Sequence, residues 1–367
     1  MITPALTIGM AHDSDFEGLV STIQALRIYH DCRQVEFLVV DNSPTSDHGQ
    51  HCQDFLGKID GHGNLGARYV AMHSPIGTSA PRNRVFEEAR GEAVLCLDCH
   101  VILWPESIAR LLDFYRQHPC CDDLLSGPIR WDNLVGGATH FADEWRCQML
   151  GTWGQAWRCA CSEIAGTRFS TRIYGIRMMK DNAALPADTT SQECVSYHEL
   201  AMGARALRRC DNCGLEFPLD LPWAGHEAGL DRLGYIRLDE DPRLAWFPIP
   251  GQGLGLFSCR RDAWPGFPAE CRGFGGEEIC IHERFRQRSG RAICLPWLRW
   301  WHRFGHPAGR GRPAYTADKV RNYLIWHRVL GWDTEALYEH FVTGRQIDEE
   351  AYVRLEAQVA ELAMCDE

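Results

Sequence analysis

An acidic residue and a histidine stand two positions apart, directly after an apolar run. The run Val94–Leu97 is followed by Asp98, Cys99 and His100. An unbroken apolar run is typical of a strand buried on both faces of a parallel sheet, and ligands bind outside the carboxyl ends of such strands. Residues i and i+2 of an extended chain point the same way, so Asp98 and His100 could share one divalent cation. The alternative is that Asp98 caps the following helix and His100 is a solvated loop residue.

Apolar runs and helix-spaced segments alternate over the first hundred residues. The alternation predicts right-handed βαβ units and a doubly wound sheet. Asp13, Asp41 and Asp98 each follow the carboxyl end of an expected parallel strand, so we expect them to converge. The predicted strands are Leu6–Met10, Val35–Val40, Tyr69–Met72 and Val94–Leu97, and the predicted helices are Phe16–Tyr29 and Ala80–Ala89, the second after a capping sequence at Gly77-Thr78-Ser79.

The glycine patterns exclude two common nucleotide sites. No G-x-G-x-x-G follows the first strand, and no P-loop is present. Gly251-x-Gly253-x-Gly255 lies far downstream, where we expect a close-packed strand. A metal on Asp98 and His100 could neutralise a diphosphate in place of a glycine-rich loop.

The whole chain has 367 residues and a net charge of -11, which argues against a general polyanion-binding protein. It shows no basic amino-terminal leader and no apolar run near the ~20 residues of a membrane span, so we expect a cytoplasmic protein without a membrane partner. Most of the 17 cysteines are expected to be buried free thiols.

Several sequence blocks, in order, resemble a known family. They are L-T-I-G-M, V-E-F-L-V-V-D-N-S, G-T-S-A-P-R-N-R, G-E-A-V-L-C-L-D-C-H, G-F-G-G-E-E-I-C-I-H-E-R-F and L-P-W-L-R-W-W-H-R-F. Together they resemble a GT-A-fold, family-2-like glycosyltransferase, and the D-x-H and W-H-R-F forms are most similar to the polypeptide N-acetylgalactosaminyltransferase branch. The resemblance implies an α/β, GT-A fold with a doubly wound mixed sheet, to which this chain's own pattern adds a small zinc-ribbon-like insertion and C-terminal helices.

The resemblance also implies roles for matching residues. Ala11, Asp13 and Asp41 would line the base and ribose pocket of a nucleotide diphosphate sugar, most expectedly a UDP-sugar. Arg82 would contact the nucleotide or sugar. Asp98, His100 and His302 would hold the metal, with His306 as the rival third ligand; alternatively, His302 belongs to an aromatic cluster with the neighbouring tryptophans.

The chemistry of the leaving group fits a metal. A departing nucleoside diphosphate carries negative charge, and a Mn²⁺ or Mg²⁺ ion on its phosphates stabilises the transition state more than the ground state. Two histidines favour Mn²⁺.

Glu277 and Glu278 match an acidic pair beside the sugar and acceptor, and they open the predicted helix Ile279–Arg288. We expect one of them to contact the acceptor or act as its base, together with Asp98 in the catalytic set. Acids in a first helical turn also occur simply because they complement the helix dipole. The D-x-H form slightly favours a retaining reaction, in which no base is needed.

The stretch from 291 to 328 is rich in arginine. Arg303 and the Gly309–Arg312 segment are interpreted as a loop that closes over the pyrophosphate, and the alternative is a solvated basic surface. Three helices are expected to finish the chain, at Ala317–Leu330, Thr334–Val342 and Glu349–Ala363.

The family pattern lapses between Trp157 and Trp246, where cysteines recur. Cys159, Cys161, Cys210 and Cys213, the last two in a C-x-x-C-G knuckle, suit a structural tetrahedral Zn²⁺. The alternative is four free thiols, and substitute ligands are Cys194, His198 and His226.

These features predict four regions: a nucleotide-sugar half (1–157), the cysteine-containing insertion (158–245), an acceptor and metal-completing half (246–312) and a helical extension (313–367). The predicted function is metal-dependent transfer of a sugar to an acceptor hydroxyl, and a hydroxylated DNA base is one candidate acceptor. The alternative is a non-catalytic, zinc-ribbon nucleic-acid-binding protein on the same scaffold.

Overall fold

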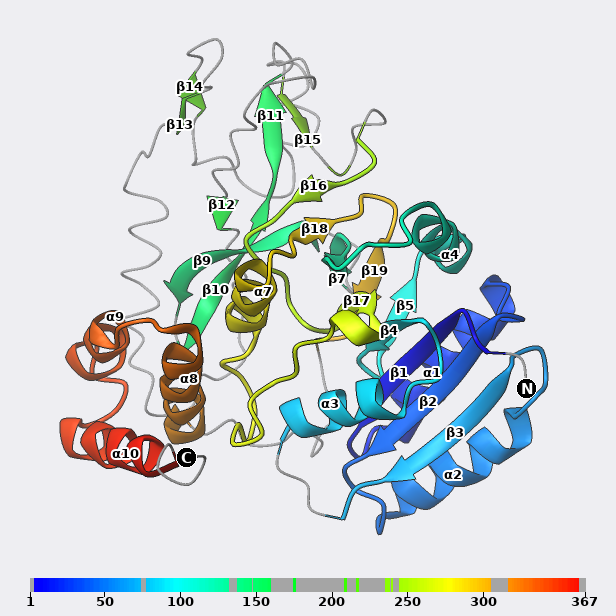
Figure 1. Cartoon of the computed structure of the whole chain (residues 1–367), viewed down its shortest axis with the longest axis horizontal. Helices are drawn as coiled ribbons and strands as arrows, with labels where there is room; N and C mark the ends of the chain where they lie inside the picture. The colour runs from blue at the N-terminus through cyan, green and yellow to red at the C-terminus, as the bar shows by residue number, and fades with distance from the viewer. Residues whose placement is uncertain are drawn as a thin grey trace.

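The structure is a computed structural model. It describes residues 3–73, 77–131, 137–146, 148–159, 174–175, 208–209, 216–217, 235–237, 239, 244–304 and 316–362. A large mixed sheet flanked by helices forms the main body, and three helices stand together at the C-terminal end (Figure 1).

Eight strands form the central sheet, in the order β16-β18-β6-β17-β4-β1-β2-β3. The four strands from the first hundred residues run parallel to one another, whereas β17 is antiparallel to its neighbours β4 and β6. The sheet is therefore mixed, as predicted. Its strands are β1 (Leu6–His12), β2 (Val35–Asp41), β3 (Gly66–Ala71), β4 (Ala93–Leu97), β6 (Leu124–Ser126), β16 (Phe247–Pro248), β17 (Leu256–Arg260) and β18 (Ala292–Cys294).

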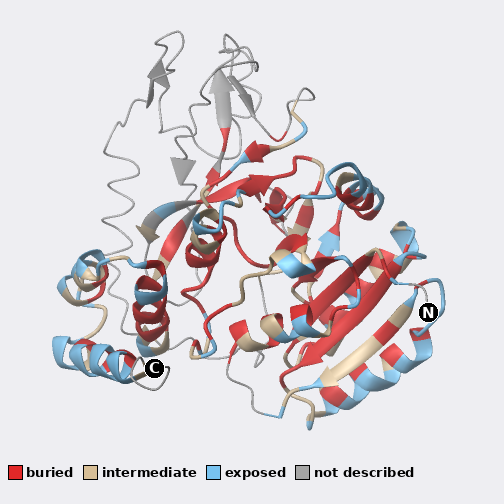
Figure 2. Ribbon diagram, viewed as in Figure 1, coloured by how far each residue is buried: buried red, intermediate tan, exposed pale blue. Residues whose placement is uncertain are grey.

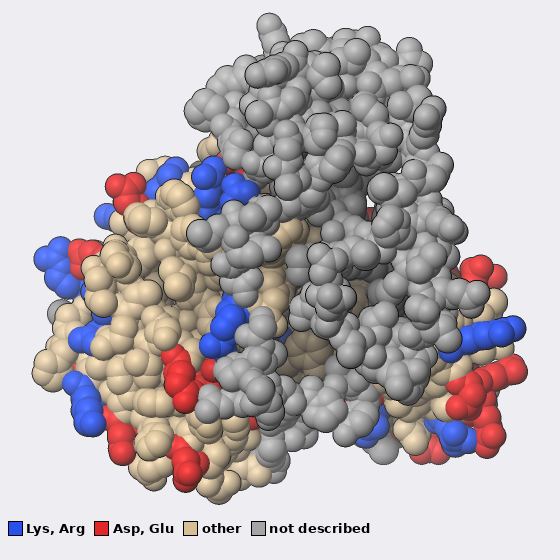
Figure 3. Space-filling view, turned by 180° about the vertical axis from the view of Figure 1, so that it is seen from behind, with Lys and Arg blue, Asp and Glu red and all other residues tan. Residues whose placement is uncertain are grey.

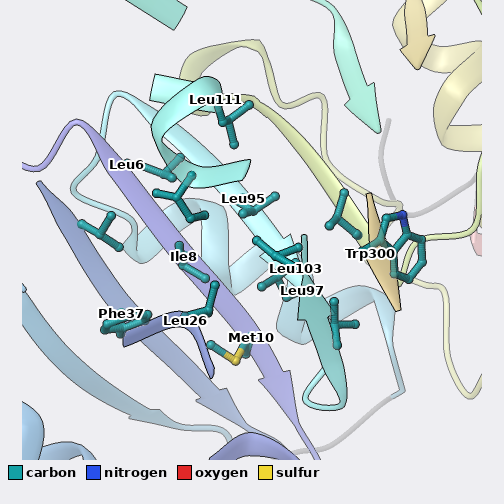
Figure 4. Packing of buried hydrophobic residues seen from close by; sticks show 14 of the residues in the cluster. Leu6, Ile8, Met10, Leu26, Phe37, Leu95, Leu97, Leu103, Leu111 and Trp300 are labelled. Carbon is teal, nitrogen blue, oxygen red and sulfur yellow. The ribbon is translucent and has the colours of Figure 1, made fainter. Parts of the chain in front are cut away.

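Strand β4 explains why the sheet needs cover on both faces. All five of its residues are buried. Because side chains alternate along a strand, Leu95 and Leu97 enter one hydrophobic cluster while Val94 and Cys96 enter the other. Figures 2 and 4 show this buried sheet and the packing of its first face.

Helices cover the two faces according to the same alternation. Apolar side chains of α1 (Phe16–Tyr29), α2 (Asp47–Ile59) and α4 (Ser107–Gln117) join the first cluster. The second cluster takes in α3 (Ser79–Glu88), α7 (Glu278–Gln287) and the C-terminal helices. The C-terminal helices are α8 (Thr316–Leu330), α9 (Glu335–Tyr338), which continues as a π-helical turn over Glu339–Thr343, and α10 (Glu349–Leu362).

A second sheet, ordered β5-β19-β7-β8, joins distant parts of the chain. Within it, β19 runs antiparallel to β5 and places His302 opposite Val101. Val101, which directly follows His100, is thereby paired with a residue about two hundred positions later in the sequence. The strands are β5 (Val101–Leu103), β7 (Ile129–Trp131), β8 (Gly137–Ala138) and β19 (Trp300–His302).

None of the helices in the described ranges combines the length and the apolar character that a membrane span requires.

The remaining strands form small sheets. One small sheet places β10 (Met149–Gln155) between β9 (His140–Arg146) and β12 (Tyr174–Gly175). The other two pair β11 (Trp157–Cys159) with β15 (Tyr235–Arg237), and β13 (Arg208–Arg209) with β14 (Glu216–Phe217).

Three local expectations were wrong. The Gly251–Gly255 segment is not a strand: β17 begins only at Leu256, and Trp300 crowds Gly255. Thr78 stands at the start of α3 but makes no side-chain cap, because its hydroxyl binds a glutamate elsewhere in the fold. The helix expected at Thr334–Val342 is α-helical only to Tyr338, after which it widens into the π-helical turn.

Candidate metal centre and its acidic neighbours

Asp98 and His100 lie on the short loop between β4 and β5, and His302 ends β19. The His302 Nε2 atom lies 3.4 Å from Asp98 Oδ2, and the ring centroids of His100 and His302 are 4.7 Å apart. One ligand atom from each of the three residues lies within 4.8 Å of the other two. Two imidazoles and a carboxylate gathered this closely form a donor set that fits Mn²⁺.

Asp15, at the start of α1, contacts the candidate ligand His100 and also Arg303. Its Oδ2 atom lies 3.0 Å from His100 Nδ1 and accepts a hydrogen bond from Arg303 Nη2 at 2.7 Å. Burial alone would raise the pKa of Asp15, but the hydrogen bonds from His100 and Arg303 outweigh burial and hold this pKa well below its usual range. Asp15 therefore presents a carboxylate to both partners.

Arg82, from α3, links the candidate metal ligands to the acidic pair. It is 6% exposed and donates from Nη2 to Asp98 Oδ1 at 3.0 Å and from Nη1 to Glu277 Oε1 at 3.3 Å. Burial alone would raise the pKa of Asp98, but the charge of Arg82 and the hydrogen bond with His302 lower it overall. Because Arg82 engages Oδ1, the other oxygen of Asp98 faces His302.

Glu277 and Glu278 are both buried at the start of α7, in different surroundings. Glu277 Oε1 also accepts a hydrogen bond from Thr78 Oγ1 at 2.7 Å. Burial, reinforced by the neighbouring charge of Glu277, raises the pKa of Glu278 to about 7. Among the described residues, the Oε2 atoms of both glutamates are buried without a hydrogen-bond partner. An orphaned buried carboxyl oxygen is costly, so these atoms are suited to receive a donor group of a ligand.

The predicted base-pocket residues lie at the ends of β1 and β2. Asp41 is fully buried, and its carboxylate binds His12 Nδ1 at 2.8 Å and Tyr69 Oη at 2.6 Å. Burial alone would raise the pKa of Asp41, but these hydrogen bonds lower it. Ala11 and Asp13 flank His12 and are partly exposed.

Asp13, Asp41 and Asp98 follow three adjacent strands of the sheet, β1, β2 and β4. Asp41 is hydrogen-bonded to His12, whereas Asp98 is hydrogen-bonded to Arg82 and lies 3.4 Å from His302. Asp15, two residues beyond Asp13, contacts the candidate metal ligand His100.

The predicted zinc ligands mostly lie outside the described residues. Cys159 ends β11, but its side chain is not described. The other positions outside the described residues are Cys161, Cys210 and Cys213, the substitutes Cys194, His198 and His226, the rival ligand His306, and the Gly309–Arg312 segment.

Sequence reasoning missed Asp15, His12 and Thr78 as members of the site. Asp15 did carry a signal, because it stands before the first helix as an N-cap residue and accepts from Gly18 N. Acidic residues are common at helix starts, so the position of Asp15 in the sequence does not predict its second contact, to His100. The Thr78 contact spans 199 residues and has no local signal.

Comparisons with known proteins bear on the fold and on the sequence family. A family model described as Glycosyl transferase family 2 matches residues 15–149. The chain superposes on the crystal structure of GalNAc-T7 with UDP, GalNAc and Mn²⁺ at a TM-score of 0.53 and 13% identity, covering 98% of this chain and 55% of that one. S. aureus TarS 1–349 in complex with UDP-GlcNAc matches at a TM-score of 0.31 and 20% identity, over 36% of each chain. No curated protein is similar enough in sequence to count as a relative.

The GalNAc-T7 superposition, which spans nearly all of this chain and about half of that one, shows the GT-A fold. The TarS likeness covers too little to add to it. The family 2 model matches residues 15–149, which is less than half of the chain.

Proposed function

We propose that the protein transfers a sugar from a nucleotide diphosphate donor, most simply a UDP-sugar, to an acceptor hydroxyl, and that it needs Mn²⁺ or Mg²⁺. The observation that carries the proposal is the close approach of Asp98, His100 and His302 at the carboxyl end of β4. UDP and Mn²⁺ are named with the GalNAc-T7 structure, which shares the fold. A metal held by these residues would stabilise the negative charge that develops on the departing diphosphate.

The chain's own residues then take distinct roles. Arg82 orients Asp98 and Glu277 through its two nitrogens, and Arg303 brings a guanidinium to the edge of the candidate metal centre. Glu278, whose pKa is raised to about 7 by burial, contacts the acceptor or sugar hydroxyl. Ala11, Asp13 and Asp41 line the base and ribose pocket, with Asp41 acting through His12 and Tyr69 because its own oxygens are already bound.

Donor hydrolysis tests the proposal directly. Purified protein with Mn²⁺ should release nucleoside diphosphate from a UDP-sugar, and Asp98→Ala should lower the rate by about 10²-fold or more, because several kcal/mol of charge stabilisation is lost. Chelation of the metal should have the same effect on the wild type. An Asp98→Ala protein that hydrolyses the donor at the wild-type rate would show that the metal assignment is wrong.

The stereochemistry and the acceptor are finer proposals. The D-x-H form supports retention, which NMR of the product anomer tests. A hydroxylated DNA base is proposed as one acceptor because the cysteine pattern of the insertion resembles a zinc ribbon. Mass spectrometry of nucleosides after incubation with hydroxymethylated DNA should then show a mass gain of one sugar residue, and structural Zn²⁺ should be found by elemental analysis.

The non-catalytic alternative predicts salt-sensitive DNA binding that survives Asp98→Ala. Over the described surface in Figure 3, basic and acidic side chains are interspersed rather than gathered into one basic patch.

A further inference from the structure

The carboxylate of Asp15 serves three partners at once. Its Oδ1 accepts from Gly18 N at 3.3 Å and caps α1, while its Oδ2 faces His100 Nδ1 at 3.0 Å and Arg303 Nη2 at 2.7 Å. Asp15 is only 9% exposed. A carboxylate held this way has little freedom to turn away from His100.

This contact fixes where the imidazole proton lies. A carboxylate can only accept hydrogen bonds, so the Nδ1 atom of His100 must carry the proton. In a neutral imidazole with a proton on Nδ1, the Nε2 atom keeps its lone pair. Carboxylates that hold a metal-binding histidine in this way also set its ring orientation.

Helix α1, which Asp15 caps, also forms hydrogen bonds to the backbone on both sides of His100. Thr22 Oγ1 donates to the Cys99 carbonyl at 3.1 Å and accepts from the Val101 N–H at 3.0 Å. The close approach depends on Gly18, because a Cβ there would lie 2.4 Å from Asp15 Oδ2 and 2.7 Å from the Cys99 oxygen. One face of α1 is therefore shaped to hold both the ring and the loop.

We propose that Asp15 is a positioning residue that selects the Nδ1–H tautomer of His100, so that Nε2 is the nitrogen that binds the metal. The inference deepens the proposed function and rests on it, because it assigns a role to an acid that contacts a candidate ligand. It is measurable in the metal-free protein, which separates it from any assay of transfer.

The first test uses the wild-type protein without metal. Protein with ¹⁵N-labelled histidine is examined by long-range ¹H–¹⁵N NMR at a pH about two units above the ordinary histidine value of ~6.5, and His100 is assigned by its loss in His100→Gln. The expected signature is a protonated Nδ1 and an unprotonated Nε2. A His100 ring that carries its proton on Nε2 overturns the proposal without any need for an Asp15 variant.

The second test uses Asp15→Asn, which is matched in shape. The Asn carbonyl oxygen can still cap α1, but its amide places a donor opposite His100 Nδ1. We expect the His100 proton to move to Nε2 and the affinity for Mn²⁺, measured by electron paramagnetic resonance of the uncomplexed ion, to fall by about 10- to 100-fold.

Two controls separate this effect from others. Asp348→Asn changes another helix-capping aspartate, at the start of α10, and should leave both readouts as in the wild type. Arg303→Gln removes the other partner of Asp15 Oδ2 and should leave the His100 tautomer unchanged. If Asp15→Asn keeps the wild-type tautomer and affinity, Asp15 has no positioning role. If the wild type shows the expected tautomer yet binds no Mn²⁺, the proposed function fails while the tautomer assignment stands.

Discussion

Glu277 and Glu278 show how two neighbouring residues of one type acquire different chemistry. Glu277 is bonded to Arg82 and Thr78, whereas burial and the charge of Glu277 act on Glu278. With a pKa near 7, Glu278 changes its charge close to neutral pH, where a hydroxyl-binding residue can either accept or donate a proton.

The raised pKa of Glu278 predicts a pH-dependent stability. Its pKa is higher in the folded state, about 7, than the ordinary value of 4.5, so the folded protein binds more protons between these values and stability falls as the pH rises through this window. Glu278→Gln cannot ionise. Relative to wild type, its stability should rise between about pH 4.5 and pH 7, by about 3 kcal/mol at the upper end.

The measurement is urea unfolding of both proteins across this pH range. Glu283→Gln, on the same helix but half-buried and paired with Arg286, is the matched control and should follow the wild-type slope. If the unfolding free energies of wild type and Glu278→Gln changed with pH in the same way, the raised pKa of Glu278 would be contradicted.

At the scale of elements, the candidate metal centre depends on how closely the turn before β17 approaches β19. The Gly255 carbonyl accepts from Asp98 N at 3.0 Å. A Cβ on Gly255 would lie 2.9 Å from a Trp300 ring carbon and 3.0 Å from His302 Cδ2. One glycine therefore sets the spacing between the loop that carries Asp98 and the strand that carries His302.

Gly255→Ala should push β19 away and displace His302. We expect a loss of about 1–3 kcal/mol in unfolding free energy, because the core is overpacked, together with weaker Mn²⁺ binding. Calorimetry with and without Mn²⁺ measures both effects.

Gly57→Ala is the matched control, since Gly57 is exposed in α2 and a Cβ there meets nothing within 4 Å. It should stabilise the protein by about 0.5–1 kcal/mol through helix propensity and leave Mn²⁺ binding unchanged. If Gly255→Ala and Gly57→Ala had the same unfolding free energy and the same Mn²⁺ affinity, the close approach at Gly255 would not be needed for the metal centre.

At the scale of the whole molecule, the candidate ligands come from distant parts of the sequence. Asp98 and His100 follow β4, and His302 lies about two hundred residues later, yet β5 and β19 pair directly. A metal that binds all three residues stabilises only the folded chain, because the unfolded chain does not hold them together.

Manganese should therefore raise the melting temperature. At a concentration about 100 times its dissociation constant, the stabilisation should be ~2.7 kcal/mol, read by differential scanning calorimetry. His302→Ala should abolish most of the shift, whereas His62→Ala, an exposed histidine after α2, should keep it. A shift of equal size in His302→Ala would place the metal elsewhere.

Much of the fold follows from local pattern. The buried runs at β1, β2 and β4 and the helical spacing of α1 were predicted within two residues of their observed bounds, because apolar periodicity reports directly which residues must leave water. The D-x-H spacing indicated a metal site because a strand end fixes the direction of both side chains.

Other features were decided only by tertiary packing. Asp15 was not predicted as a site residue, and it reaches His100 because the start of α1 approaches the β4 loop. Similarly, Thr78 has the sequence context of a helix cap but binds Glu277 across the fold. The sequence by itself determined which residues could bind a metal, since residue type and strand position are local properties. Which of them meet depended on contacts between segments far apart in the chain, which no local pattern records.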